Sequence, residues 1–280
     1  MFKIGLSTAT KITEELFASY KRAGIECMEV SRGKEETDAY DYDKIKEWSE
    51  KYGIELYSFH LPFMPFGVLD ISNPNLAEST IEYLKDIIDK ACAIGIDKFI
   101  IHASGEPIDE NDRTKRMECA KISLNILATY TKERGAVLCV EDLPRTCLGR
   151  DSSDILELIS ANENLRVCFD TNHLLEEENI DFIRKVGDKI VTLHVSDYDR
   201  VNERHWLPGE GINDWQRIIS ELNKIGYSGA WLYEIDYQTG TIIRDRAIVD
   251  EDFVRNANEL FENKPLTLFS KPKPNLGYWN

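Results

Sequence analysis

The sequence predicts an α/β protein folded as a single (βα)8 TIM barrel with a short C-terminal extension. Short apolar runs alternate with amphipathic segments, and several of these segments end at a glycine just before the next run. Near-continuous apolar runs of strand length are typical of parallel strands that are buried on both faces. The length of 280 residues also suits one barrel of this kind.

Eight apolar runs have the length of strands. They span residues 3–8, 27–31, 56–60, 98–103, 137–142, 167–171, 190–195 and 230–235. Four segments between them carry helical periodicity and end at glycine, over residues 12–24, 77–95, 123–135 and 214–226. Glycine just past a helix is a common C-terminal signal. No GxGxxG motif follows the first run, which disfavours a dinucleotide-binding sheet.

The barrel is expected to occupy residues 1–263, and residues 264–280 form a separate C-terminal tail. After Leu266 the tail contains two prolines and no periodicity. Such a segment is typical of an extended arm, a contact with a partner or a mobile end. No linker divides the chain, so we expect one domain.

Composition excludes several classes of function. The net charge of −16 opposes general affinity for nucleic acids and anionic membranes. The sequence has no apolar run of membrane-spanning length and no signal-peptide pattern at its start. The six cysteines form no CxxC pair, which favours reduced thiols in a cytoplasmic protein. The expected partner is a small molecule, and a homo-oligomer stays open.

All five histidines lie at the C-terminal end of a predicted strand or in the loop just after it. They are His60, His102, His173, His194 and His205. Three carboxylates occupy the same layer, and these are Glu141, Asp170 and Glu234. The carboxyl ends of barrel strands converge on one face, where active sites lie. Buried carboxylates beside histidines are costly unless they are paired or bind a cation, so this set predicts a site for Mn²⁺, Zn²⁺ or Mg²⁺.

Other polar residues near these strand ends are assigned structural roles. A carboxylate at a strand end often caps the next helix or pairs with an arginine. We expect Glu29, Asp142 and Asp197 to be structural residues and not metal ligands. Arg145 and Arg150 are expected to be surface or capping residues. The aromatic residues Phe63, Phe66 and Trp206 either form an apolar wall for a sugar or pack the loops.

Five motifs make the chain resemble the xylose isomerase-like barrel superfamily, from the first strand to about residue 263. They are VEDLP at 140–144, FDTNH at 169–173, LHVSDYDR at 193–200, PGEG at 208–211 and YEID at 233–236. This superfamily includes ketose 3-epimerases, hydroxypyruvate isomerases, inosose dehydratases and type IV apurinic endonucleases. The resemblance implies a TIM barrel and an enzyme that uses a divalent metal.

The resemblance also implies roles for individual residues. In the sugar epimerases of this family one divalent ion, Mn or Zn with Mg or Co possible, is held by positions that match Glu141, Asp170, His194 and Glu234. His173 and Arg200 match positions that contact the substrate. Members of the family often keep strand-three and strand-four histidines as substrate contacts, and the matching residues are His60 and His102.

The type IV endonucleases hold three zinc ions with additional histidines and an Asp-x-His pair. This chain has His60, His102 and the loop pair Glu203 and His205, although Glu203 replaces the aspartate. The net charge of −16 and the lack of a Lys/Arg cluster disfavour binding to DNA. We therefore expect Glu203 and His205 to contact substrate, while a second metal and loop packing stay open for His205.

The function that follows is a metal-dependent sugar isomerase or epimerase of a ketose or polyol. Glu141 and Glu234 would remove and return a proton through an enediolate. Alternatives are an inosose dehydratase or glycoside lyase, an endonuclease-like phosphodiesterase and a barrel without catalytic activity. The sequence contains no phosphate-binding glycine loop or Lys/Arg cluster, which favours a free sugar, although a helix N-terminus can bind a phosphate.

Overall fold

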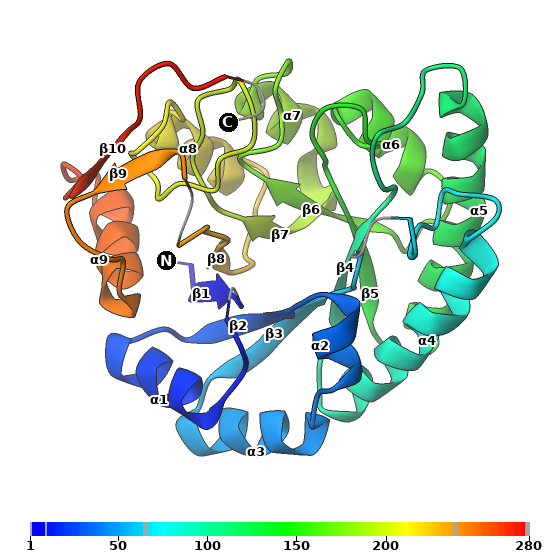
Figure 1. The fold of residues 1–280 in the computed structure, drawn as a ribbon, viewed down its shortest axis with the longest axis horizontal. Coiled ribbons are helices and arrows are strands. Elements are labelled where there is room, and N and C mark those ends of the chain that lie inside the picture. Colours follow the sequence, from blue (N-terminus) through cyan, green and yellow to red (C-terminus); the bar gives the residue numbers. More distant parts are fainter. Residues whose placement is uncertain (1, 9, 64–66, 238–239, 278–280) are drawn as a thin grey trace.

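The computed structural model describes residues 2–8, 10–63, 67–237 and 240–277. Eight parallel strands form one sheet in the order β7-β6-β5-β4-β3-β2-β1-β8, and helices surround it (Figure 1). A parallel bridge between Val195, just after β7, and Tyr233 of β8 joins the two edge strands. The predicted TIM barrel is therefore confirmed.

The barrel strands occur where the apolar runs predict them. They are β1 (Ile4–Ser7), β2 (Cys27–Ser31), β3 (Glu55–His60), β4 (Lys98–His102), β5 (Val137–Glu141), β6 (Arg166–Asp170), β7 (Ile190–His194) and β8 (Trp231–Tyr233). All eight predicted strands are found in chain order, with ends that differ by two residues at most. Neighbouring strands are parallel throughout, as the continuous apolar pattern indicates.

Helices link consecutive strands. They are α1 (Glu14–Ala23), α2 (Lys34–Asp38), α3 (Tyr42–Tyr52), α4 (Ala77–Ala93), α5 (Arg113–Lys132), α6 (Ser152–Ile159), α7 (Asn179–Val186), α8 (Trp215–Lys224), α9 (Asp250–Phe261) and the 3-10 helix η1 (Gly187–Lys189). The four predicted helices are confirmed, but the pattern over 123–135 covers only the second half of α5. None of the helices in the described part of the chain has the length and apolar character that a membrane span requires.

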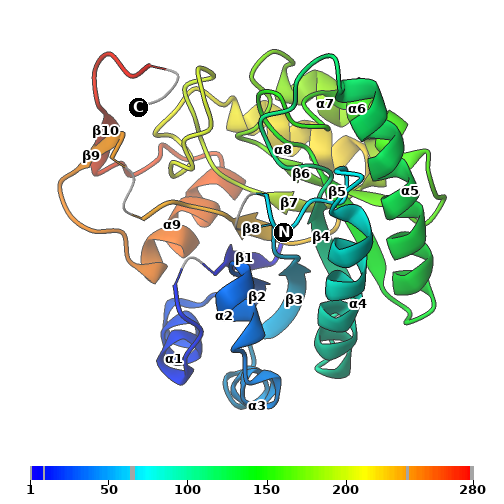
Figure 2. The same cartoon turned by 45° about the vertical axis from the view of Figure 1, so that its right-hand side comes forward.

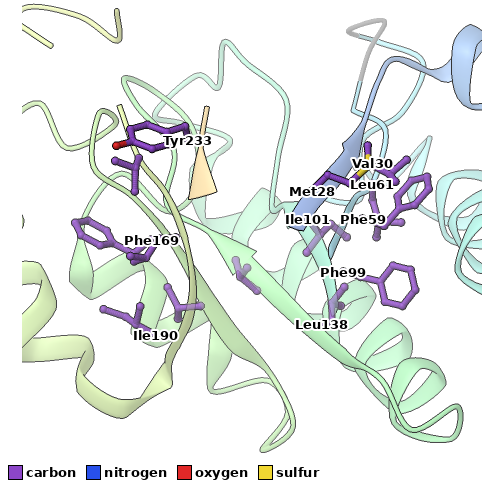
Figure 3. Close-up of a cluster of buried hydrophobic side chains, with 14 of the residues drawn as sticks. Met28, Val30, Phe59, Leu61, Phe99, Ile101, Leu138, Phe169, Ile190 and Tyr233 are labelled. Carbon is purple, nitrogen blue, oxygen red and sulfur yellow. The ribbon is translucent and has the colours of Figure 1, made fainter. Parts of the chain in front are cut away.

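The apolar core between the strands and the helices determines the direction in which the polar residues at the strand ends point. Figure 3 shows part of this core, with Phe169 and Tyr233 among the buried side chains. Phe169 stacks on Phe182 of α7 with a ring-centroid distance of 5.1 Å, so it faces the helices. Successive side chains of a strand point to opposite faces. The next residue, Asp170, is therefore directed into the barrel.

The tail lies on the loops that follow β7 and β8. Its strand β10 (Ser270–Pro272) pairs antiparallel with β9 (Ile242–Arg244) beside α9 (Figures 1 and 2). The Arg204 side chain, only 1% exposed, donates from Nη2 to the Gly277 carbonyl at 2.8 Å and from Nε to Asp199 at 2.9 Å. The expected arm is thus extended and packed against its own barrel, while a contact with a partner stays a prediction.

Replacing Arg204 by methionine tests this attachment. We expect Arg204→Met to lower the free energy of unfolding by about 1–3 kcal/mol, because the half-buried acceptors Asp199 and Gly277 lose a charged donor. Chemical denaturation measures the change. Lys271→Met, at an exposed position of the same hairpin, is the control and should leave stability unaltered. Equal stability of both variants would show that the tail is not anchored in this way.

Candidate metal centre

Four predicted ligands meet at the carboxyl ends of consecutive strands. Glu141 ends β5, Asp170 ends β6, His194 ends β7, and Glu234 directly follows β8. One ligand atom from each lies within 4.8 Å of the others, and all but the intermediate Glu234 are buried. The parallel register aligns Asp170 with His194 on neighbouring strands. The structure thus brings together the whole set that the sequence proposes as metal ligands.

The two nitrogens of His194 face different carboxylates. Nδ1 lies 2.8 Å from Glu141 Oε1 and 3.2 Å from Glu234 Oε2. Nε2 lies 3.0 Å from Glu29 Oε1, which also accepts a hydrogen bond from Ser7. This contact does not have hydrogen-bond geometry. Glu29 also accepts a hydrogen bond from Ser58, so it lies among structural partners behind His194, as expected of a residue that is not a metal ligand.

Asp170 provides a direct test of whether a cation fits. Its Oδ1 accepts the Asn172 N–H at 2.7 Å, but its Oδ2 is buried with no hydrogen-bond partner among the described residues. Burial raises the pKa of this carboxyl well above its ordinary value. His173 opposes this rise, while the nearby Glu234 and Glu141 add to it. An unpaired buried carboxylate is costly. Three carboxylates and one imidazole suit Mn²⁺ or Zn²⁺, so the donor set fits a divalent ion.

Histidines hold the two glutamates in their charged form. Burial raises the pKa of Glu141, but His194 and His102 outweigh it and keep the pKa well below its ordinary value. Burial likewise opposes ionisation of Glu234, while His194 and His205 lower its pKa overall. Both side chains are thus available as anionic ligands or proton acceptors.

His60 ends β3 and His102 ends β4, and both side chains lie next to the four candidate ligands. Their Nε2 atoms lie 3.0 and 3.1 Å from Glu141 Oε2. Phe63 stacks on His102 with a centroid distance of 3.9 Å and lines the cavity, as expected for an apolar wall. Trp206 is instead buried and donates to Thr241, so it packs the loop. Phe66 lies outside the described residues.

A further group of possible metal-ligating side chains lies beside the first set of four. His173, Glu203 and His205 also place ligand atoms within 4.8 Å of one another. His173 Nε2 is 3.3 Å from Glu203 Oε2, and its Nδ1 is 2.7 Å from the Asp142 carbonyl. Burial lowers the pKa of His173, but Asp170 and Glu203 outweigh it and raise the pKa well above the ordinary value. The three residues can bind either a substrate or a further cation.

These groups surround one cavity of about 240 Å³ at the barrel mouth. Its wall includes His60, His102, Glu141, His173, Glu203, His205 and Glu234 from the predicted set. Asp170 and His194 lie against these residues. Arg200 is not on the wall, because it forms an ion pair with Glu178. The predicted contact between Arg200 and a substrate therefore stays a prediction, and this geometry does not support it.

The prediction that Arg145 is a surface or capping residue is wrong. Its side chain is 8% exposed and lines the cavity, where it pairs with Glu106 and Glu203. Both Arg145 and Glu106 escape sequence reasoning, because they lie in loops and their proximity comes only from folding. Arg150 is a surface residue as expected, and it pairs with Glu110.

The remaining acidic residues have the structural roles predicted for them. Asp142 Oδ1 accepts the Asp170 N–H at 2.7 Å and so fixes the strand end that carries a ligand. Asp197 accepts four hydrogen bonds, from the backbone of Tyr198, Gly209 and Asn213 and from the indole of Trp215. It thereby shapes the loop between β7 and α8.

Comparisons with known proteins agree with this geometry. A family model described as a xylose isomerase-like TIM barrel matches residues 17–255. The chain belongs to this family. It is 26% identical over 275 residues to D-psicose 3-epimerase of Enterocloster bolteae, covering 88% of this chain and 87% of that one. It is 23% identical over 222 residues to a probable endonuclease 4 of Staphylococcus aureus, covering 75% and 67%.

Solved structures of ketose 3-epimerases share the fold. A D-tagatose 3-epimerase-like protein superposes with a TM-score of 0.80 at 20% identity, over 93% of this chain and 97% of that one. D-psicose 3-epimerase from Clostridium cellulolyticum H10, solved with D-tagatose, gives a TM-score of 0.72 at 20% identity, over 85% and 86%. The chain is thus a sugar epimerase-like member of its family with a buried cluster of metal-ligand type.

Metal binding is the first prediction from this site. We expect Mn²⁺ or Zn²⁺ to stabilise the fold by about 2.7 kcal/mol at a concentration 100 times Kd, since a ligand that binds only the native state does so. An Asp170→Asn, His194→Ala double variant should lose both the stabilisation and the bound ion, measured by thermal unfolding and elemental analysis. The surface variant Glu110→Gln should keep both. Stoichiometric metal in the double variant would contradict the ligand assignment.

Proposed function

We propose that this protein is a divalent-metal-dependent sugar isomerase or epimerase that moves a proton next to the carbonyl of a ketose or related polyol. The observation that carries this proposal is the placement of Glu141 and Glu234, which contact His194 Nδ1 from two different strands. Two ionised carboxylates at one buried centre are suited to remove and return a proton. Similarity to ketose 3-epimerases supports the same chemistry.

The first part of the site would hold the cation. Its ligands would be Glu141, Asp170, His194 and Glu234, with Mn²⁺ or Zn²⁺ as the expected ion and Mg²⁺ or Co²⁺ as further candidates. A bound divalent ion stabilises the negative charge that develops on the carbonyl oxygen when the neighbouring carbon loses its proton. Asp170 contributes an otherwise unpartnered oxygen, so it favours cation binding most directly.

The second part of the site would transfer protons. One glutamate, in its ionised form, removes the proton from one face of the carbon, and an enediolate forms. The other glutamate takes up a proton from water and donates it to the opposite face, while the first releases its proton to water. Return to the same carbon gives epimerisation, and return to its neighbour gives aldose–ketose isomerisation. Loss of a β-hydroxyl would give a dehydratase. His60 and His102 hold Glu141 Oε2 and so keep this base oriented.

The third part would bind the sugar. His173, Glu203 and His205 lie on the cavity wall and offer polar atoms for hydroxyl groups, while Phe63 offers an apolar surface. The cavity of about 240 Å³ is smaller than the pockets that take drug-sized ligands, as suits a single sugar unit. The wall thus combines the few converging polar groups and the apolar surface that are typical of small-molecule sites.

Proton exchange tests the function. The protein loaded with Mn²⁺ is incubated with ketoses, inososes and keto-acids in D₂O, and NMR spectra are recorded after removal of the metal. Deuterium beside the carbonyl is expected, and its position separates a 3-epimerase from a 1,2-isomerase or dehydratase. Glu141→Gln and Glu234→Gln should each lower exchange by a factor of about 100 or more, as expected for loss of an acid–base group. Glu110→Gln should exchange at the wild-type rate.

Metal content of both variants keeps the interpretation clear, because both glutamates are also ligands. A variant that retains the metal and the fold but loses exchange supports an acid–base role. Full exchange in either variant would remove the two-glutamate mechanism. Absence of exchange with every compound, in a wild-type protein that is folded and metal-loaded, would contradict the proposed function.

A second candidate is metal-dependent phosphodiester cleavage. It is favoured by the group of His173, Glu203 and His205, which could hold a further cation, and by the relative described as a probable endonuclease 4. The net charge of −16 opposes binding to DNA. Under this candidate, more than one metal ion would be bound per chain, His205→Ala would remove one of them, and an abasic duplex would be cleaved. A single bound ion and an intact duplex are expected under the first proposal.

A further inference from the structure

The wall of the cavity carries an ion pair whose role the proton-transfer mechanism does not require. Glu106, in the loop after β4, and Arg145, in the loop after β5, both line the cavity. The Arg145 side chain is 8% exposed and that of Glu106 is 22% exposed. Among the described residues, Arg145 is the only lysine or arginine on this wall. It is therefore the permanently cationic side chain that an anionic substrate would meet.

The donors of Arg145 are already engaged by the protein. Nε donates to Glu106 Oε2 at 2.9 Å, and Nη2 donates to the other oxygen of the same carboxylate. Nη2 also donates to Glu203 Oε1 at 2.8 Å, while Nη1 donates to Asn202 Oδ1 at 2.6 Å. A bidentate pair with a carboxylate uses the same geometry that would bind a phosphate. A phosphate could form a bidentate pair with this guanidinium only by displacing Glu106, or Glu203 together with Asn202.

The charge of the cavity disfavours that displacement. Glu106, Glu141, Glu203 and Glu234 line the cavity, and Asp170 lies against them. Arg145, a protonated His173 and one divalent cation together carry four positive charges, which is fewer than the five negative charges of these carboxylates. A phosphate ester would add further negative charge to an acidic, partly buried site, where repulsion is weakly screened. A neutral sugar meets no such repulsion.

The other position where barrels bind phosphate is also occupied. In many TIM barrels, backbone N–H groups of the loops after strands seven and eight hold a phosphate. Here Asp197 accepts the N–H groups of Gly209 and Asn213 at 2.8 and 3.1 Å. Asp214 caps the start of α8, where its side chain accepts the Arg217 N–H. In the loop after β7, the protein's own carboxylates thus take these donors, which a phosphate would otherwise bind.

The backbone conformation of Arg145 indicates that surrounding contacts hold this residue in position. Its φ of +57° lies in the left-handed region, which a non-glycine residue adopts at an energetic cost. Such strain persists when surrounding contacts hold the residue in place, and it gathers at functional sites. The contacts with Glu106, Asn202 and Glu203 are the ones that hold this side chain.

We propose that Glu106 neutralises Arg145 and makes the pair a charge filter, which admits uncharged sugars or polyols and excludes their phosphate esters. This inference rests on the proposed function, because it names the substrate class of the same site. Glu106 is thus a specificity residue, and Arg145 additionally positions Glu203. The pair is expected to affect which molecules bind and to leave the metal ligands in place.

Binding of inorganic phosphate tests the filter without turnover. Calorimetric titration compares the metal-loaded wild type, Glu106→Gln and a Glu106→Gln, Arg145→Gln double variant. Loss of the Glu106 charge should tighten phosphate binding by about tenfold or more, since the guanidinium gains charge-assisted hydrogen bonds to the anion. The double variant should lose this gain. Glu110→Gln, which breaks an exposed Arg–Glu pair with Arg150, should bind phosphate as the wild type does.

A second comparison uses the wild type alone, with D-fructose against D-fructose 6-phosphate and D-ribulose against D-ribulose 5-phosphate. No phosphate ester should bind more tightly than its free sugar. The filter is refuted if a folded Glu106→Gln protein gains no phosphate affinity, or if a phosphate ester binds more tightly than its free sugar.

If Glu106→Gln does not fold, the wild type and Arg145→Gln still decide the question. If the wild type binds phosphate and Arg145→Gln weakens this binding tenfold, the filter is refuted. If the wild type does not bind phosphate, or if Arg145→Gln leaves its phosphate affinity unchanged, the filter is supported. Failure of the proposed function would show instead as absent deuterium exchange, which these titrations do not measure.

Discussion

Closure of eight parallel strands is the constraint on which the rest of the structure depends. Because every strand runs in the same direction, every strand end reaches the same mouth, and residues far apart in sequence become neighbours there. Glu141 and Glu234 approach the same nitrogen of His194, although they come from β5 and from the end of β8. The apolar core explains this precision, since Phe169 packs against α7 and thereby turns Asp170 inward.

The mouth concentrates charges that would be costly elsewhere. Buried carboxylates are tolerated because histidines or a cation can compensate them. Among the oxygens of the four candidate ligands, Asp170 Oδ2 is buried without a hydrogen-bond partner in the described residues and marks where this compensation is incomplete. Asp142 and Asp197 instead bind backbone N–H groups and shape loops. The same residue type thus serves two purposes, and the position of each carboxylate relative to the other candidate ligands distinguishes them.

The loops above the barrel are held by contacts with distant segments. Arg145 and His205 have φ values of +57° and +49°, and both line the cavity. The loop that contains Glu203 and His205 is anchored through Arg204 to the tail at Gly277. The tail therefore supports the site from outside the barrel. This arrangement links the stability of a terminal segment to the geometry of the substrate wall.

The sequence by itself determined the barrel and its inner ring of candidate metal ligands, because local apolar periodicity defines strands and parallel strands align their ends. It also located His60, His102 and His173, since each lies on a strand end or directly after one. The tertiary structure alone decided the outer wall. Glu106 meets Arg145 across two loops, and Arg200 turns to Glu178 away from the cavity. Loop conformation depends on long-range contacts that no local pattern encodes, and for this reason the ion pair at the mouth could only be found in the folded chain.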